Sequence, residues 1–223
     1  MKHLKEYKLW EQSRELTTEQ EGFLNRYVKG TWRINSEGLV DVEGDFDCSL
    51  SGIKSLMGIR FGSVGGNFYC SSNQLTSLEG APEKVDGDFH CNKNQLISLK
   101  GAPEKVGWNF YCSYNQLTSL EGAPREVSGD FYCMDNQLIS LEGATRDVGG
   151  NYYFSDNPVS VETLNKIISA MEANPEMGYG AILASLQSRI SQEDWEKLDK
   201  SSLDKMNQTR KKVYGMLGGI GGI

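Results

Sequence analysis

Cysteine is the residue type whose spacing in this chain first suggests chemistry. Five cysteines stand at positions 48, 70, 91, 112 and 133, so successive members lie 22, 21, 21 and 21 residues apart. Structural zinc sites use cysteine pairs about two to four residues apart, and this sequence has none. Even spacing instead marks one structural position that recurs once per repeat. We therefore expect a column of buried, reduced thiols rather than a metal or redox centre.

Histidine adds little to this search. His3 lies in a charged N-terminal segment, and His90 lies within a repeat with no cysteine or aspartate partner fixed around it by the sequence. No nucleophile elbow, zinc-protease helix or phosphate-binding loop is present. The sequence thus predicts no catalytic residue, no metal site and no cofactor, and we do not expect an enzyme.

Alignment on the cysteines reveals a repeat that explains their spacing. From Gly66 to Pro82 it reads Gly-Asn-Phe-Tyr-Cys-Ser-Ser-Asn-Gln-Leu-Thr-Ser-Leu-Glu-Gly-Ala-Pro. The alternation in Phe-x-Cys predicts a short strand with both of these side chains inward, and two leucine columns and a valine column complete the core. One such repeat cannot bury a core alone, so the coils must stack into a solenoid.

An asparagine column follows the predicted strands. In a stack of similar coils, its amide can bond the backbone groups of the adjoining coil that a turn leaves unpaired. This expected structural ladder consists of Asn73, Asn94, Asn115, Asn136 and Asn157.

Changes in the repeat pattern predict the organisation of the chain. We expect an N-terminal cap over residues 1–45, a solenoid of about six coils over 46–158, a helical region over 159–217 and a glycine-rich tail over 218–223. In the cap, a capping box in Thr17-Thr18-Glu19-Gln20-Glu21 predicts a helix over 17–28 with an apolar face, ended by Gly30, and strands should follow near 32–34 and 39–42. The fold class is α+β, with the solenoid as its main part.

Composition narrows the functions. Thirty acidic against 23 basic residues give a net charge of −7, which argues against binding to a nucleic-acid backbone. The longest apolar runs are only a few residues and no secretory signal is visible, so we expect a cytoplasmic protein without a membrane partner.

The string Phe89-x-Cys91-x-x-Asn94-x-Leu96-x-x-Leu99 resembles the leucine-rich repeat, and Lys100-Gly101-Ala102-Pro103 is similar to a segment of short bacterial-type leucine-rich repeats. Beyond the repeat, the chain resembles leucine-rich-repeat proteins of large tailed bacteriophages, including the exit Asn157-Pro158-Val159-Ser160. The resemblance implies a leucine-rich-repeat-like parallel β-solenoid. Bacterial effector ligases with similar repeats need a catalytic cysteine in a large C-terminal domain, and no cysteine follows Cys133.

The candidate site is the surface between the inward strand positions, expected on the concave side of the solenoid. Tyrosine there can simply stack down the ladder, or it can form an aromatic, mildly acidic groove for a protein partner, and the two interpretations are compatible. The candidate binding residues are Tyr69, His90, Tyr111, Tyr132, Tyr153, Asp88, Asp130 and Tyr114.

Two functions remain in competition. The first is a non-catalytic protein–protein interaction module, which the phage resemblance suggests binds and inhibits a host protein, for example a defence protein, in the host cytoplasm. The second is a structural or assembly component of a phage particle. An enzyme in the C-terminal region lacks a catalytic constellation, and mimicry of DNA would need denser carboxylates. The partner and the oligomeric state are not fixed by the sequence.

Overall fold

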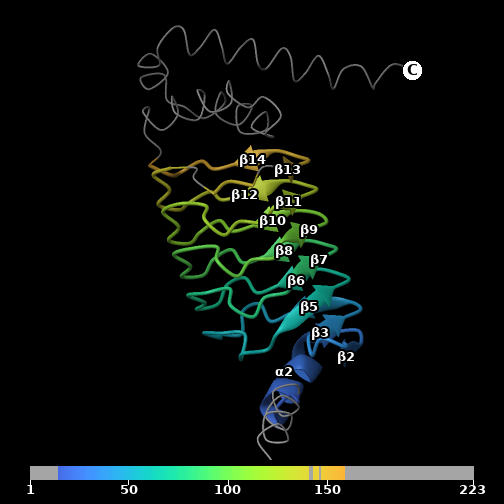
Figure 1. Cartoon of the computed structure of the whole chain (residues 1–223). Helices are drawn as coiled ribbons and strands as arrows, with labels where there is room; N and C mark the ends of the chain where they lie inside the picture. Colours follow the sequence, from blue (N-terminus) through green and yellow to red (C-terminus); the bar gives the residue numbers. More distant parts are fainter. Residues whose placement is uncertain (1–14, 141–142, 146, 159–223) are drawn as a thin grey trace, which may run out of the picture.

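The structure is a computed structural model that describes residues 15–140, 143–145 and 147–158. The predicted C-terminal helical region and glycine-rich tail lie outside the described residues. The described chain winds into a parallel β-solenoid with one short N-terminal helix (Figure 1), which confirms the predicted solenoid. One of its two sheets contains six parallel strands, so the chain makes five full turns between the first and the last of them. The prediction was about six coils.

Sheet A runs along the side of the Phe-x-Cys segments. From its N-terminal edge it consists of β1 (Val28–Lys29), β4 (Asp45–Asp47), β6 (Phe68–Tyr69), β8 (Phe89–His90), β10 (Phe110–Tyr111), β12 (Phe131–Tyr132) and β14 (Tyr152–Tyr153). The pairing is parallel and in register from β4 onward, so equivalent residues of successive coils lie opposite each other. Only β1 is antiparallel, and it covers the edge of β4.

Sheet B is a second sheet, of which the sequence predicted only the first two strands, near 32–34 and 39–42. It consists of β2 (Trp32–Ile34), β3 (Val40–Val42), β5 (Phe61–Val64), β7 (Lys84–Val85), β9 (Lys105–Val106), β11 (Glu126–Val127) and β13 (Asp147–Val148). The valine column was expected only as part of the core. From β7 onward its strands have only two residues, which is too short to show an alternating pattern, so their pairing alone reveals them.

The core lies between the two sheets and the leucine-bearing return arcs. The phenylalanine rings stack from coil to coil between Phe46 and Tyr152, with centroid distances of 4.5–5.4 Å. All five cysteines are free and buried in the adjoining column, as predicted. The burial raises the pKa of the Cys48 thiol to about 12, so these thiols remain protonated and inert at neutral pH.

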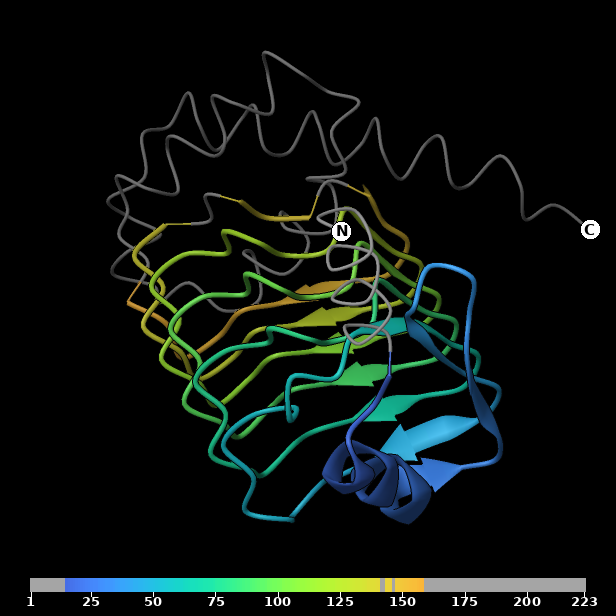
Figure 2. The ribbon, with the colours of Figure 1, turned by 60° about the horizontal axis from the view of Figure 1, so that its bottom comes forward.

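Helix α2 (Thr18–Tyr27) covers the first coil, at the lower end of the solenoid in Figures 1 and 2. Its capping box is present, because Thr17 Oγ1 accepts from Gln20 N and Gln20 Oε1 accepts from Thr17 N. Leu24 is fully buried, and the Phe23 ring lies 5.8 Å from that of Phe46. The helix thus closes the core at this end, and it ends at Tyr27 because the chain continues directly into β1.

The first coil is one residue longer than the others, and the structure locates the extra residue. Val40 pairs with Phe61 while Val42 pairs with Val64, so the register of β3 and β5 shifts between these two pairs. This is a β-bulge, which inserts one residue into a strand without disturbing the coils that follow. The bulge therefore accounts for the one extra residue in the interval of 22 residues from Cys48 to Cys70.

The asparagine column joins each coil to the preceding one. Asn115 Nδ2 donates to the carbonyls of Cys91 and Cys112 at 3.1 and 3.0 Å, while its Oδ1 accepts from Leu96 N at 3.0 Å. The same three-way pattern holds at Asn94, Asn136 and Asn157. Buried backbone groups at each turn are paired in this way, and the strand ends on sheet A are held in place.

Candidate functional site

The outer face of sheet A carries a continuous stack of aromatic rings. This aromatic ladder consists of Tyr69, His90, Tyr111, Tyr132 and Tyr153, all half-buried and pointing away from the core. Neighbouring ring centroids lie 4.2–4.8 Å apart, and the rings from His90 to Tyr153 are within 13° of parallel. Because each ring covers the face of the next, the ladder presents ring edges and hydroxyl groups to a partner. It offers no wide aromatic faces along its length.

A second ladder lies beside the first, and the sequence analysis missed its role. This acid–amide column alternates strictly between aspartate and asparagine: Asp45, Asn67, Asp88, Asn109, Asp130 and Asn151. Each member's backbone N–H donates to the Oδ1 of the member one coil earlier, at 2.6–2.8 Å. The alternation at a fixed interval was the signal available in the sequence.

The alternation has an electrostatic reason. Carboxylates on successive coils would lie about 5 Å apart and repel each other. An intervening asparagine keeps the oxygen acceptor that the next coil needs and carries no charge. Its amide can also donate, as Asn67 Nδ2 does to Asp45 Oδ1 at 3.2 Å.

The second carboxylate oxygen orients the aromatic ladder. Asp130 Oδ2 accepts from the Tyr132 hydroxyl at 2.9 Å, and Asp88 Oδ2 lies 3.8 Å from His90 Nε2. The predicted binding residues Asp88 and Asp130 therefore lie beside the predicted tyrosine column. They also hold the coils together, so part of each carboxylate is already engaged.

The environment favours the uncharged forms of Tyr132 and His90. Burial, together with the hydrogen bond to Asp130 and its charge, raises the pKa of Tyr132. Burial lowers the pKa of His90, and the nearby Asp88 opposes this shift. The Tyr132 and His90 rings are therefore uncharged at neutral pH.

Two large aromatic side chains depart from the repeat, and both lie in one coil. Trp108 stands where the other coils have glycine, and its side chain is 65% exposed. Tyr114 was predicted on the same face, but it lies in the turn after β10, has a φ of 58° and is 51% exposed. It belongs to a corner column of left-handed residues, namely Ser72, Lys93, Tyr114, Asp135 and Asp156. Trp108 was not singled out from the sequence.

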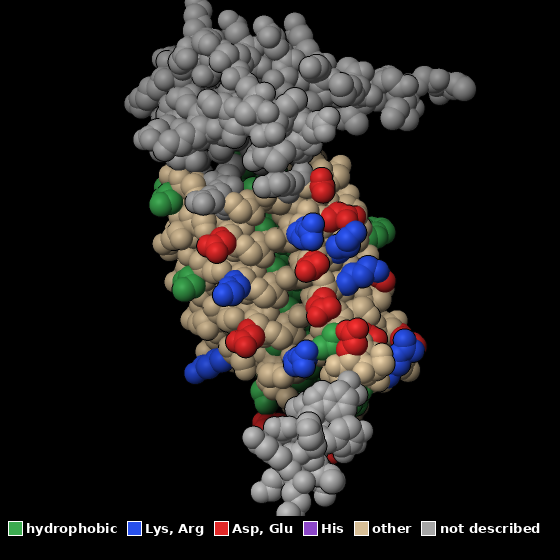
Figure 3. Space-filling model, viewed as in Figure 1, with side chains coloured by type: hydrophobic (Ala, Val, Ile, Leu, Met, Phe, Trp, Pro, Cys, Tyr) green, Lys and Arg blue, Asp and Glu red, His purple; other side chains and the backbone are tan. Residues whose placement is uncertain are grey.

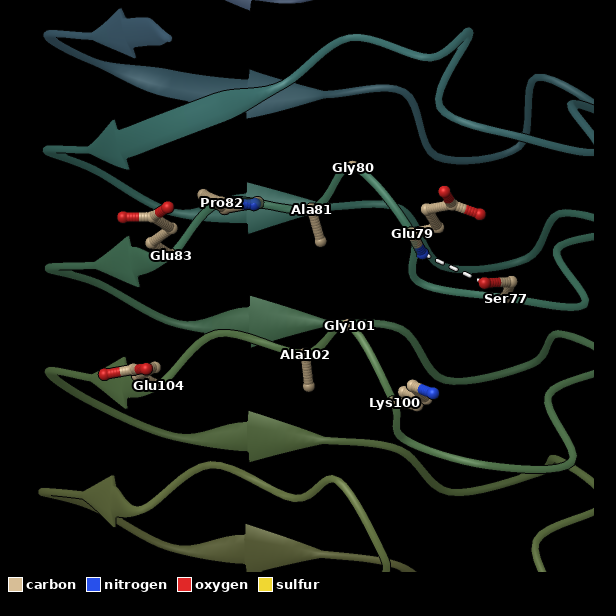
Figure 4. A pocket seen from close by; sticks show the side chains of 10 residues that line it. All are labelled: Ser77, Glu79, Gly80, Ala81, Pro82, Glu83, Lys100, Gly101, Ala102 and Glu104. Carbon is tan, nitrogen blue, oxygen red and sulfur yellow. Dashed lines mark hydrogen bonds between the residues drawn. The ribbon is translucent and has the colours of Figure 1, made fainter. Parts of the chain in front are cut away.

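A shallow groove elsewhere on the solenoid is the second candidate (Figure 4). It has a volume of about 640 Å³ and lies between two Gly-Ala turns, with Glu83 and Glu104 at one end and Glu79 and Lys100 at the other. Ser77 Oγ accepts from Glu79 N at 3.0 Å, which fixes one of these turns. The lining pairs no nucleophile with a base, so the groove offers no catalytic arrangement.

Other kinds of site are not found in the described part of the chain. There, no three His, Cys, Asp or Glu side chains converge as metal ligands. Within the same residues, no helix is long and apolar enough to cross a bilayer. The face in Figure 3 carries acidic and basic side chains interleaved, with no broad region of one sign. The sheet-A face is the surface that combines aromatic and acidic groups in a regular array.

Fold and face together define a class: a β-solenoid of short coils that displays an aromatic ladder on one sheet. Comparisons of this chain with protein-family models, curated proteins and solved structures find no match. Its function must therefore be inferred from the chemistry of the sheet-A face, which comprises the aromatic ladder, the acid–amide column and the corner column.

Proposed function

We propose that this protein is a non-catalytic interaction module that binds a partner protein through the sheet-A face. The observation that carries the proposal is the stack of five outward rings beside a row of carboxylates. The solenoid core needs only the inward columns, whereas an outward tyrosine column supplies contact area at low entropic cost. Regular stacking also fixes the rings in advance, which reduces the entropy lost on binding.

The resemblance to phage leucine-rich-repeat proteins supports a host protein as this partner. Binding would take place in the host cytoplasm and would inhibit the partner by covering its surface. Because the ladder presents edges and hydroxyls, the partner surface should be flat enough to contact several coils at once.

Site-specific photo-cross-linking tests this proposal. A benzophenone amino acid at Tyr111 should capture one predominant host protein in cells, identified by mass spectrometry. The same group at Thr118, exposed on the return arc of the same repeat, is the matched control. Equal capture at the two positions would overturn the choice of face, and capture of particle proteins would favour the structural role instead.

A further inference from the structure

Trp108 occupies a place in the coil that the fold reserves for glycine. The equivalent residues are Gly44, Gly66, Gly87, Gly129 and Gly150. A Cβ at Gly87 or Gly129 would lie 2.4 Å from the Oδ1 of Asn67 or Asn109, so the column favours residues without a side chain. The acid–amide column nevertheless continues past Trp108, with Asn109 N donating to Asp88 Oδ1 at 2.8 Å. The fold accommodates this exposed indole without needing it.

Tyr114 is a second departure with a local cost. Its left-handed φ of 58° is disfavoured for a bulky side chain. Trp108 and Tyr114 flank Tyr111, one on each side of strand β10, and six residues of chain span at most about 20 Å. One coil thus carries three aromatic residues with exposed or half-buried side chains: Trp108 before β10, Tyr111 within it and Tyr114 after it.

Carboxylates surround this coil. Asp88 lies in the preceding coil, and Asp130, Asp135 and Asp156 lie in the following ones. Between Asn67 and Asp156, Lys93 is the one lysine or arginine in the three columns of the sheet-A face. The Lys93 Nζ of the preceding coil lies 5.7 Å from the centre of the Tyr114 ring, so an aromatic ring of this coil already contacts a cation.

From these observations we infer that the sheet-A face, together with the adjoining Trp108, binds arginine side chains of its protein partner, with Trp108, Tyr111 and Tyr114 as the contact centre. The inference rests on the proposed function and names the chemistry that this function recognises. A guanidinium can stack on an exposed indole while its N–H groups pair with a carboxylate, and an ammonium cannot do both with one planar group. The negative sign of the face selects a basic partner surface.

Labelled nona-arginine and nona-lysine peptides, titrated into the full chain by fluorescence anisotropy, provide the test. The arginine peptide should bind about tenfold more tightly, a margin typical of one cation–π contact with partial desolvation. Trp108→Gly restores the residue of the other coils, so the fold should persist with an unchanged melting temperature. In that variant the arginine peptide should fall to the affinity of the lysine peptide. Equal affinity of the two peptides for the wild type would overturn the inference.

Matched charge variants separate this site from the general attraction of an acidic protein. Asp88→Asn with Asp130→Asn keeps the Oδ1 acceptors that the acid–amide column needs. Glu83→Gln with Glu104→Gln removes the same charge at the groove of Figure 4. The first pair should weaken the arginine peptide about tenfold and the second less than about twofold. Equal losses would contradict the inference.

The proposed function can survive failure of this inference. If Trp108→Gly leaves both the peptide affinities and the capture of a partner at Tyr111 unchanged, the arginine inference is wrong and the interaction module stands. If cross-linking at Tyr111 captures no more than at Thr118, the proposed function itself fails.

Discussion

Replacing Asn115 with alanine tests the structural ladder at the middle of the stack. The substitution removes an amide that donates to Cys91 O and Cys112 O and accepts from Leu96 N. The two carbonyls keep a second donor, since Asn94 also bonds Cys91 O and Asn136 also bonds Cys112 O. The Leu96 N–H loses its acceptor in a buried segment. An orphaned buried N–H costs about 1–3 kcal/mol and each of the two lost bonds to the carbonyls about 0.5–1, so unfolding should become easier by about 2–5 kcal/mol.

Urea denaturation measures this loss directly. The midpoint should fall by about 1 M or more without a change in the slope, given a slope of about 2 kcal/mol/M. Gln116→Ala is the control, because Gln116 is the next residue and its side chain is exposed. If the two variants lose the same stability, the asparagine column does not hold the coils together and this reasoning is refuted.

Three further predictions concern particular positions. Thr145 N donates to the buried Tyr152 hydroxyl at 3.3 Å, whereas the earlier coils have proline and phenylalanine at these two positions. Thr145→Pro should therefore lower the free energy of unfolding by about 1–3 kcal/mol, and adding Tyr152→Phe should recover most of this loss. Additive losses in a urea double-mutant cycle would exclude the coupling. Leu50 is 82% exposed and has a φ of 55°, so Leu50→Asn should stabilise the fold by about 1 kcal/mol. Ile97→Asn is the control, because Ile97 is also exposed but has no positive φ, and it should not raise the melting temperature. Because all five cysteines are buried, the native thiols should resist a thiol reagent that labels five cysteines in the denatured protein, and rapid labelling of the native protein would contradict the inward register. Burial raises the pKa of Cys48 to about 12, so the stabilising contribution of its protonated thiol should be fully present below about pH 8.5 and should be lost as the pH rises toward 12.

The sequence predicted the core and the outward tyrosines because alternation in Phe-x-Cys has only one inward solution. Of sheet B it predicted only the first two strands, because the strands from β7 onward have two residues each and carry no periodic signal. The bulge in β5, between Phe61 and Val64, was visible only as a longer interval between cysteines, since its place depends on the pairing of two distant strands.

The candidate site was predicted only in part, for similar reasons. Strand alternation predicted that Tyr111 points outward, but whether a ring offers its face or its edge depends on the register of the neighbouring coils. The structural role of the acid–amide column was not predicted, because one hydrogen-bonding role is filled there by two residue types. Trp108 was not predicted as a site residue, because it is a single exception in a column of glycines. Its significance depends on how little space the neighbouring coil leaves for a side chain at the equivalent glycines, which only the structure reveals.

The central claim is that the sheet-A face binds the partner protein. Its most direct test is the affinity of the partner identified by cross-linking for the double variant Tyr111→Ala with Tyr132→Ala. Both rings lie outside the core, so the fold should persist while two clustered aromatic anchors are lost. Because such anchors contribute about 2 kcal/mol or more each, we predict that binding weakens about a hundredfold or more, and that Glu104→Ala with Glu121→Ala changes it little. Unchanged affinity in the tyrosine variant, with a loss in the glutamate variant, would contradict the assignment of the sheet-A face as the binding surface.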